Sequence, residues 1–318
     1  MHGGGYLEWF GTRYDSDYLA TKLASKGYSV FNIEYLRYFL PFDIRGAMWR
    51  ATQYQAAFIK HLSTHHKEFG VDKDRIVLVG QSAGAISSLL NVLMDENDYV
   101  ESEIYQILDE LYGCLDCNSP YDEVEIKDVV KGVVSIAGGI TDYKLLDPEN
   151  LENTQFLFVH GNEDFIVPYD GGLPLQEVGQ AYNDVFEILG KEITRGLREL
   201  DREIFDNRFR DEIELWAEYL KLFSFEDAQH MHRAINEKGG NSLLMELQGE
   251  GHFLMNAALN QVPKRYTGEI VDEIDQFVEM AAGKQKLAAK FKDVSTPKKV
   301  LIVSGASLCL FFVARMFL

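Results

Sequence analysis

A serine between small residues stands where an apolar strand pattern changes into a helix pattern. Residues 80–84 read Gly-Gln-Ser-Ala-Gly and follow an apolar run that ends at Val79. A nucleophile elbow needs this context, because its sharp strand-to-helix turn strains the serine backbone, exposes Oγ and leaves room only for small neighbours. A chance turn rich in small residues is the alternative. The context favours Ser82 as the nucleophile of an acyl-transfer reaction.

A glycine run precedes this serine, as residues 2–5 read His-Gly-Gly-Gly. Glycines let backbone N–H groups turn towards an acyl oxygen, because no Cβ atoms stand in the way. A flexible N-terminal segment without a role is the alternative. The order of this run, a strand pattern at residues 28–35 and then the elbow favours an oxyanion-binding loop.

An acid and a histidine follow Ser82 in the chain order that such a triad uses, each directly after an apolar run of strand length. They are Asp164 and His252, and Glu163 is the alternative acid. A carboxylate held there can orient the imidazole and stabilise its cation, while the imidazole takes the serine proton. The sequence therefore predicts Ser82, Asp164 and His252 as the catalytic residues.

The remaining histidines and the cysteines suggest no second chemistry. His160 ends a strand pattern and is expected to be structural. Cys114 and Cys117 form a lone pair, without the second pair or the histidine cluster of a zinc site, so we predict no metal and two unpaired thiols, with a local disulfide as the alternative. Surface or packing roles are expected for His61, His65, His66, His230 and His232.

Strand-length apolar runs alternate with amphipathic stretches, which is typical of a mostly parallel sheet covered by helices on both faces. The predicted strands are residues 28–35, 75–79, 132–137, 155–160 and 242–248. The predicted helices are residues 15–26, 43–69, 82–94 and 268–282, and residues 122–128 are expected to form a loop. The sequence thus predicts one α/β domain over residues 1–290.

A charged segment at about residues 175–238 interrupts this alternation, with a helical pattern and no strand pattern inside it. We expect a helical insertion before the last strand, beside the sheet edge where open α/β folds bind ligands. A lid over the site and a solvated helical hairpin are the two interpretations.

These motifs resemble the carboxylesterase and lipase-like branch of the α/β-hydrolase superfamily that carries a His-Gly-Gly-Gly oxyanion run. Residues 69–76, before the elbow strand, and the His-Gly-x-x-Asp-x-x-Val-Pro pattern of residues 160–168 are also similar to this branch. The resemblance covers residues 1–282 apart from the insertion. It implies that an ester acylates Ser82 without a cofactor, and that an oxyanion hole is formed by Gly3, Gly4 and Ala83.

The chain departs from the family at its start, because it begins at the oxyanion run. The family has further strands before that run, including the central strand that delivers it. We therefore expect a chain truncated at its N-terminus, in which Met1 ends a missing strand, and no prediction about secretion follows.

The composition argues against nucleic acid as a partner, and the C-terminal segment suggests a membrane anchor. A net charge of −19 makes nucleic acid an unlikely partner, because it repels phosphate. Residues 300–318 carry Arg315 as their only charge and follow two lysines. As a helix they would span roughly 28 Å, so we predict a C-terminal membrane anchor at residues 298–318, with a buried terminal strand or helix as the alternative.

Together these features predict a serine esterase that acts on small-molecule or lipid carboxylic esters. An amidase or peptidase would use the same triad and is the first alternative. A non-catalytic binding protein of the same fold is the second, favoured by the missing strand and opposed by the intact triad.

Overall fold

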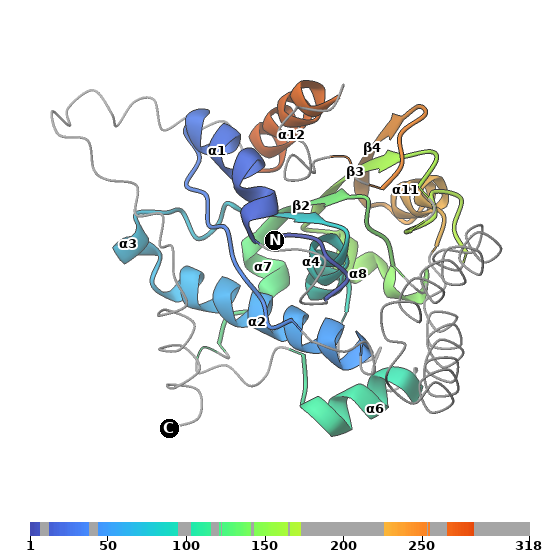
Figure 1. The fold of residues 1–318 in the computed structure, drawn as a ribbon. Coiled ribbons are helices and arrows are strands. Elements are labelled where there is room, and N and C mark those ends of the chain that lie inside the picture. Colours follow the sequence, from blue (N-terminus) through green and yellow to red (C-terminus); the bar gives the residue numbers. More distant parts are fainter. Residues whose placement is uncertain are drawn as a thin grey trace, which may run out of the picture.

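The computed structural model describes most of an α/β domain built around a parallel sheet. The described residues are 1–6, 13–37, 44–94, 103–115, 121, 123–140, 143–164, 166–172, 226–252, 254 and 266–282. Four strands pair in parallel in the order β1, β2, β3, β4 (Figure 1). Their bounds are Ile76–Gln81 for β1, Val130–Ile136 for β2, Gln155–Gly161 for β3 and Asn241–Leu247 for β4.

The inner strands are apolar on both faces because helices cover both sides of the sheet. Along β3, Phe156 and Phe158 enter one hydrophobic cluster, whereas Leu157 and Val159 enter a second cluster on the opposite face. Successive side chains of a strand point to opposite faces, so one apolar run supplies both cores.

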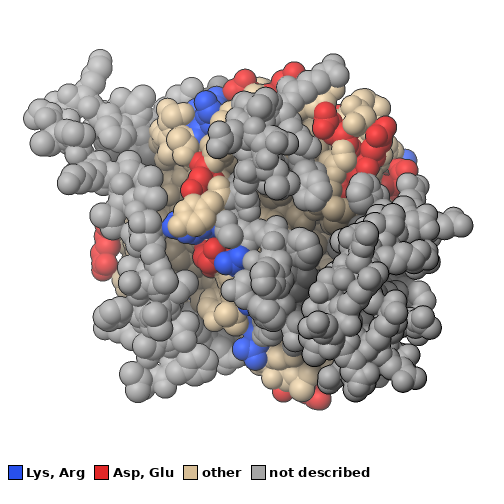
Figure 2. Space-filling view, in the orientation of Figure 1, with Lys and Arg blue, Asp and Glu red and all other residues tan. Residues whose placement is uncertain are grey.

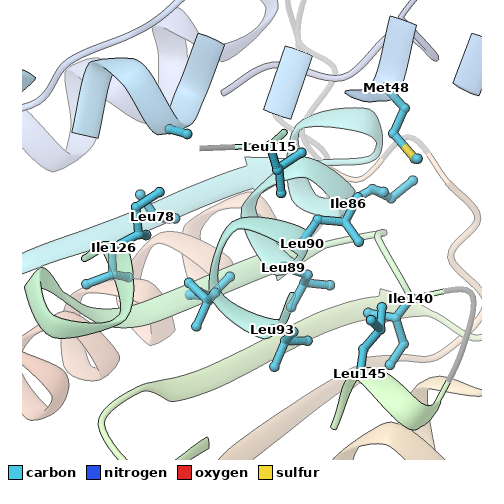
Figure 3. Packing of buried hydrophobic residues seen from close by; sticks show 14 of the residues in the cluster. Met48, Leu78, Ile86, Leu89, Leu90, Leu93, Leu115, Ile126, Ile140 and Leu145 are labelled. Atoms are coloured by element: carbon cyan, nitrogen blue, oxygen red, sulfur yellow. The ribbon is translucent and has the colours of Figure 1, made fainter. Parts of the chain in front are cut away.

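The first cluster lies against α4 (Ala83–Leu93), in which every residue is buried. Figure 3 shows Leu89, Leu90 and Leu93 of this helix pointing into the cluster. Around α4 lie α2 (Ile44–Thr64), α7 (Ile126–Val129) and α8 (Pro148–Leu151), and α11 (Ala228–Glu237) contributes residues to the same cluster. A helix enclosed in this way holds the elbow at its N-terminus rigidly.

The second cluster lies under α1 (Asp17–Ser25) and α12 (Thr267–Ala281). Figure 1 shows these two helices on one side of the sheet and α2 on the other. Four shorter or peripheral elements complete the described chain, namely the 3-10 turns η1 (Arg13–Ser16) and η3 (Tyr143–Leu145), and the helices α3 (His66–Phe69) and α6 (Glu103–Tyr112).

The predicted α/β class, with its parallel sheet and helices on both faces, is confirmed. Four of the predicted strands correspond to β1–β4, and the predicted helices correspond to α1, to α2 with α3, to α4 and to α12. The loop expected at residues 122–128 is partly wrong, because α7 begins at Ile126.

The strand predicted at residues 28–35 is not formed, since residues 28–37 are neither helix nor strand. A strand needs a neighbour for its backbone groups. Among the described strands, β1 lies at one edge of the sheet. Backbone groups at its C-terminal end are hydrogen-bonded to Met1 rather than to another strand. The Met1 amino group donates to the Val79 carbonyl at 2.6 Å, and the Gln81 amide donates to the Met1 carbonyl at 3.2 Å.

The expectation of two unpaired thiols is wrong for Cys114, which is disulfide-bonded. The two other cysteines, Cys117 and Cys309, lie outside the described residues. A sequence pattern cannot reveal this pairing, because the pairing depends on how the loop brings the Cβ atoms together.

Most of the predicted insertion, and all of the predicted anchor at residues 298–318, lie outside the described residues. Of the insertion, the structure describes residues 226–238, which include α11. Among the residues that can be judged, no helix combines the length and the apolar character needed to cross a bilayer. On the described part of the face in Figure 2, basic side chains stand beside acidic ones and form no continuous basic stripe.

Candidate active site

Ser82 occupies the turn between β1 and α4 with a strained backbone, at φ 50° and ψ −120°. A non-glycine residue in this region costs on the order of 1–3 kcal/mol, so its surroundings must hold it there. The Ser82 amide donates to the Ile136 carbonyl at the end of β2, at 2.8 Å. The Ser82 carbonyl accepts from the amides of Ala85 and Ile86, at 2.8 and 3.0 Å.

The two glycines of the elbow are required by close backbone contacts. A Cβ atom on Gly80 would lie 2.3 Å from the Gly84 carbonyl oxygen. One on Gly84 would lie 2.3 Å from the Met1 carbonyl oxygen and 2.6 Å from that of His2. The N-terminal segment therefore rests on the first turn of α4, where any larger residue would displace it.

The structure brings Ser82, Asp164 and His252 together from three separate loops. The Ser82 hydroxyl donates to Nε2 of His252 at 2.8 Å, and Nδ1 of His252 donates to Oδ2 of Asp164 at 2.8 Å. The three residues are 5–8% exposed. Glu163, the alternative acid, is exposed. This arrangement can move a proton from the hydroxyl to an imidazole whose cation faces a carboxylate.

Asp164 is held by four hydrogen bonds. Its Oδ1 accepts from the amides of Ile166 and Val167, at 2.9 and 3.0 Å, and its Oδ2 accepts from His252 and from Nε2 of His160, at 3.1 Å. Burial alone would raise the pKa of Asp164, but the hydrogen bonds from the two histidines outweigh burial and lower it from 3.8 to about 2. The carboxylate is therefore charged at neutral pH.

The predicted oxyanion residues lie next to Ser82. Ala83 is the first residue of α4, so its amide has no acceptor within the helix. A Cβ atom on Gly3 would lie 3.1 Å from the Ser82 Cβ, which shows how closely this loop approaches the nucleophile. Gly4 has φ 118°, a conformation that side chains rarely allow. The role of these three residues in binding an oxyanion stays a prediction from the sequence.

Residues that the sequence analysis did not single out brace this loop. The Tyr35 hydroxyl donates to the Gly3 carbonyl at 3.0 Å, and the buried ring of His2 stacks on Tyr35 with centroids 4.3 Å apart. Nε2 of His2 bonds Oε1 of Glu34. Because C=O and N–H point in opposite directions across a trans peptide, fixing the Gly3 carbonyl also fixes the Gly4 N–H. The only sequence signal for Glu34 and Tyr35 is their place at the end of an apolar run.

The ionisation states of Glu34, Tyr35 and Tyr6 preserve their hydrogen bonds. Burial opposes ionisation of Glu34, but the hydrogen bond from His2 outweighs this effect, so the pKa of Glu34 is lowered. Burial raises the pKa of Tyr35 and of Tyr6, so both phenols remain donors. The Tyr6 hydroxyl donates to the Ala83 carbonyl at 2.7 Å, which links the glycine run to α4.

The other histidines that the sequence analysis set aside have partners elsewhere in the fold. His61 contacts Tyr121 at 3.0 Å, and His232 contacts Ser242 at 2.8 Å. Among the described residues, no group of three or more histidine, cysteine or acidic side chains is arranged to hold a metal.

Comparison with known proteins gives a family match over more than half of the chain. The BD-FAE family, an α/β-hydrolase-type esterase domain, matches residues 1–178. This segment contains the glycine run, the elbow and the acid loop, but not His252. The predicted resemblance to α/β-hydrolase carboxylesterases is confirmed.

Individual relatives are more distant. Gut esterase 1 of Caenorhabditis briggsae is 33% identical over 91 residues, which make up 27% of this chain and 16% of that protein. Esterase 2 of Thermogutta terrifontis, phosphorylated by paraoxon, superposes with a TM-score of 0.50 at 12% identity, over 89% of this chain and 82% of the other. A truncated carbohydrate esterase from gut microbiota has a TM-score of 0.47 at 13% identity, over 87% and 84%. The Thermogutta structure shows a shared fold.

Proposed function

The chain belongs to the BD-FAE family of esterase domains, and from this membership we propose that it hydrolyses carboxylic esters through an acyl-enzyme on Ser82. The observation that carries the proposal is the chain of two hydrogen bonds, each 2.8 Å long, from the Ser82 hydroxyl through His252 to Asp164. Hydroxyl, imidazole and carboxylate are within proton-transfer distance and lie in the order that activates a serine.

In the first half-reaction the Ser82 Oγ attacks the ester carbonyl carbon while Nε2 of His252 takes the hydroxyl proton. Asp164 stabilises the resulting imidazolium, and the tetrahedral oxyanion receives hydrogen bonds from the amides of Ala83, Gly4 and Gly3. The ester C–O bond then breaks, and the alcohol leaves with the proton from His252. In the second half-reaction water attacks the acyl group with the same base, and the acid and free Ser82 are released.

Labelling with organophosphates tests this proposal directly. Thermogutta terrifontis esterase 2 is phosphorylated by paraoxon, so paraoxon and a fluorophosphonate are suitable probes. We expect one adduct per chain on Ser82 by intact mass and peptide mapping, and none with Ser82→Ala. Ser63→Ala is the matched control, because Ser63 is a buried serine on α2. Folded protein without an adduct, or with an adduct unchanged in Ser82→Ala, would refute the nucleophile.

Turnover assays separate esterase from amidase. Nitrophenyl esters of short acids should be hydrolysed with a burst of nitrophenol when deacylation is slower than acylation. The matching anilides should react far more slowly. Faster hydrolysis of the anilides would establish an amidase, and folded protein that neither forms an adduct nor hydrolyses either substrate would indicate a binding protein.

The anchor at residues 298–318 remains a prediction from the sequence, and lipid esters as substrates depend on it. Carbonate extraction of membranes from cells that express the chain with and without residues 298–318 tests it. Equal extraction of both forms would rule out the anchor, and small soluble esters would then be the expected substrates.

A further inference from the structure

His160 contacts the same carboxylate oxygen of the proposed triad acid that His252 contacts. It is the penultimate residue of β3 and is only 1% exposed. Its Nε2 lies 3.1 Å from Oδ2 of Asp164, the same oxygen that Nδ1 of His252 reaches, and 2.9 Å from the carbonyl oxygen of Val167. Two imidazoles therefore share one carboxylate oxygen.

The two neighbours of this nitrogen fix the tautomer of His160. A carbonyl oxygen can only accept a hydrogen bond, and an ionised carboxylate can only accept one as well. Nε2 of His160 must therefore carry a proton and share it between Asp164 and Val167. Because the Val167 carbonyl is an acceptor at every pH, the donor remains in place when the charge on Asp164 changes.

The contacts of Val167 close the acid loop around this bond. Its amide donates to Oδ1 of Asp164 at 3.0 Å, while its carbonyl accepts from His160 at 2.9 Å. Without His160, one oxygen of the carboxylate would lose a donor, and the buried carbonyl would lose its side-chain partner. The carboxylate would then be oriented less firmly, and its full negative charge would face His252.

We propose that His160 is a positioning residue, which holds the Asp164 carboxylate towards His252 and limits the negative charge that His252 meets. The inference rests on the proposed function, in which His252 is the general base. A second donor on the shared oxygen weakens the bond from that oxygen to His252. The titratable groups that face Asp164 among the described residues are these two histidines.

The first test uses the wild-type protein, so it does not depend on whether a variant folds. Nitrogen-15 NMR of labelled imidazoles should report a His160 ring protonated on Nε2. A ring protonated only on Nδ1 would overturn the proposal, because Nε2 could not then donate to Asp164.

The second test compares His160→Phe, which keeps a ring against Tyr169 but has no donor, with His160→Gln, whose amide nitrogen can occupy the place of Nε2. His160→Phe should lower kcat about tenfold with little change in KM, and should move the ascending limb of the pH profile to higher pH. His160→Gln should restore most of kcat and the original limb. The control is His61→Phe, which removes a histidine on α2 away from Asp164. It should change neither kcat nor the pH profile.

Unchanged kcat in folded His160→Phe, an unmoved pH limb, or equal impairment of the Phe and Gln variants would overturn the inference. If wild-type protein hydrolysed no ester, the proposed function would fail separately. The tautomer of His160 and the NMR titration midpoint of His252 in the wild type and the variants need no substrate, so they would still decide the positioning role.

Discussion

Replacing Gly84 with alanine should damage the site, although the same change usually stabilises a helix. Gly84 is the second residue of α4, where alanine would be favoured by about 1 kcal/mol from helix propensity alone. Its added Cβ would lie 2.3 Å from the Met1 carbonyl oxygen and 2.6 Å from that of His2. Both contacts are to backbone, so no side-chain rotation can relieve them.

The size of the effect follows from these distances. Relief needs a displacement of about 1 Å, because non-bonded heavy atoms rest near 3.5 Å. Met1 is fixed to β1 by its two backbone bonds, so the displacement has to be taken up at the start of α4 or in the adjoining glycine run. A misplacement of this size costs on the order of 10²-fold in rate, and overpacking costs about 1–3 kcal/mol of stability.

Gly268→Ala is the matched control. Gly268 is the second residue of α12, and a Cβ atom there would meet nothing within 4 Å. We expect Gly84→Ala to lower kcat about 10²-fold, with kcat calculated per active site titrated with fluorophosphonate. Gly268→Ala should leave kcat unchanged and raise the free energy of unfolding in urea by up to about 1 kcal/mol. A folded Gly84→Ala protein with kcat within about threefold of wild type would refute the role of this packing in the oxyanion site.

Three further predictions concern the acid and the braces. The pKa of Asp164 is lowered to about 2, so its charge stabilises the fold fully above about pH 4 and progressively less as pH falls towards 2. Asp164→Asn should therefore lower the free energy of unfolding by about 2 kcal/mol at pH 7. Urea unfolding should show that the difference in unfolding free energy between wild type and Asp164→Asn is about 1 kcal/mol smaller at pH 3 than at pH 7. An equal difference at both pH values would contradict this linkage. Asp272→Asn, a change at an exposed carboxylate, is the control. Glu34→Gln weakens the bond to the imidazole that braces the loop, and steady-state kinetics should show a several-fold lower kcat at unchanged KM, whereas a change in KM alone would argue against a bracing role. Tyr35→Phe removes the donor to the Gly3 carbonyl and should cost about 1 kcal/mol in urea unfolding together with a lower kcat, and unchanged kcat would exclude it as a brace.

The fold was predictable because its signals are local and repeated. Residues 156–159 within the predicted strand are all apolar, which indicated a strand covered on both faces, and β3 is such a strand. The elbow was predictable for the same reason, since small residues at 80–84 follow a strand and open a helix. The assignment of Ser82, Asp164 and His252 used chain order and loop position, and their catalytic roles stay predictions until the labelling and kinetic experiments are done.

The sequence could not reveal features that depend on contacts between distant segments. Residues 28–35 have strand composition, but composition does not supply the neighbour that a ladder requires. His160 looked structural because its position at a strand end says nothing about the carboxylate four residues later. Glu34 and Tyr35 lie 32 residues from the groups they hold. Such pairs become visible only when both segments are placed.

The braces also explain how a strained nucleophile and a strained glycine run can persist side by side. Ser82 and Tyr6 both have positive φ, and each costs on the order of 1–3 kcal/mol, which no local hydrogen bond offsets alone. The Tyr6 hydroxyl bonds the carbonyl of Ala83, so the two strained turns hold each other through one contact. Tyr6→Phe removes that hydroxyl. It should raise the activation free energy calculated from kcat by more than it lowers the free energy of unfolding, because the buried part of α4 keeps its packing while the two turns are no longer held in position relative to each other.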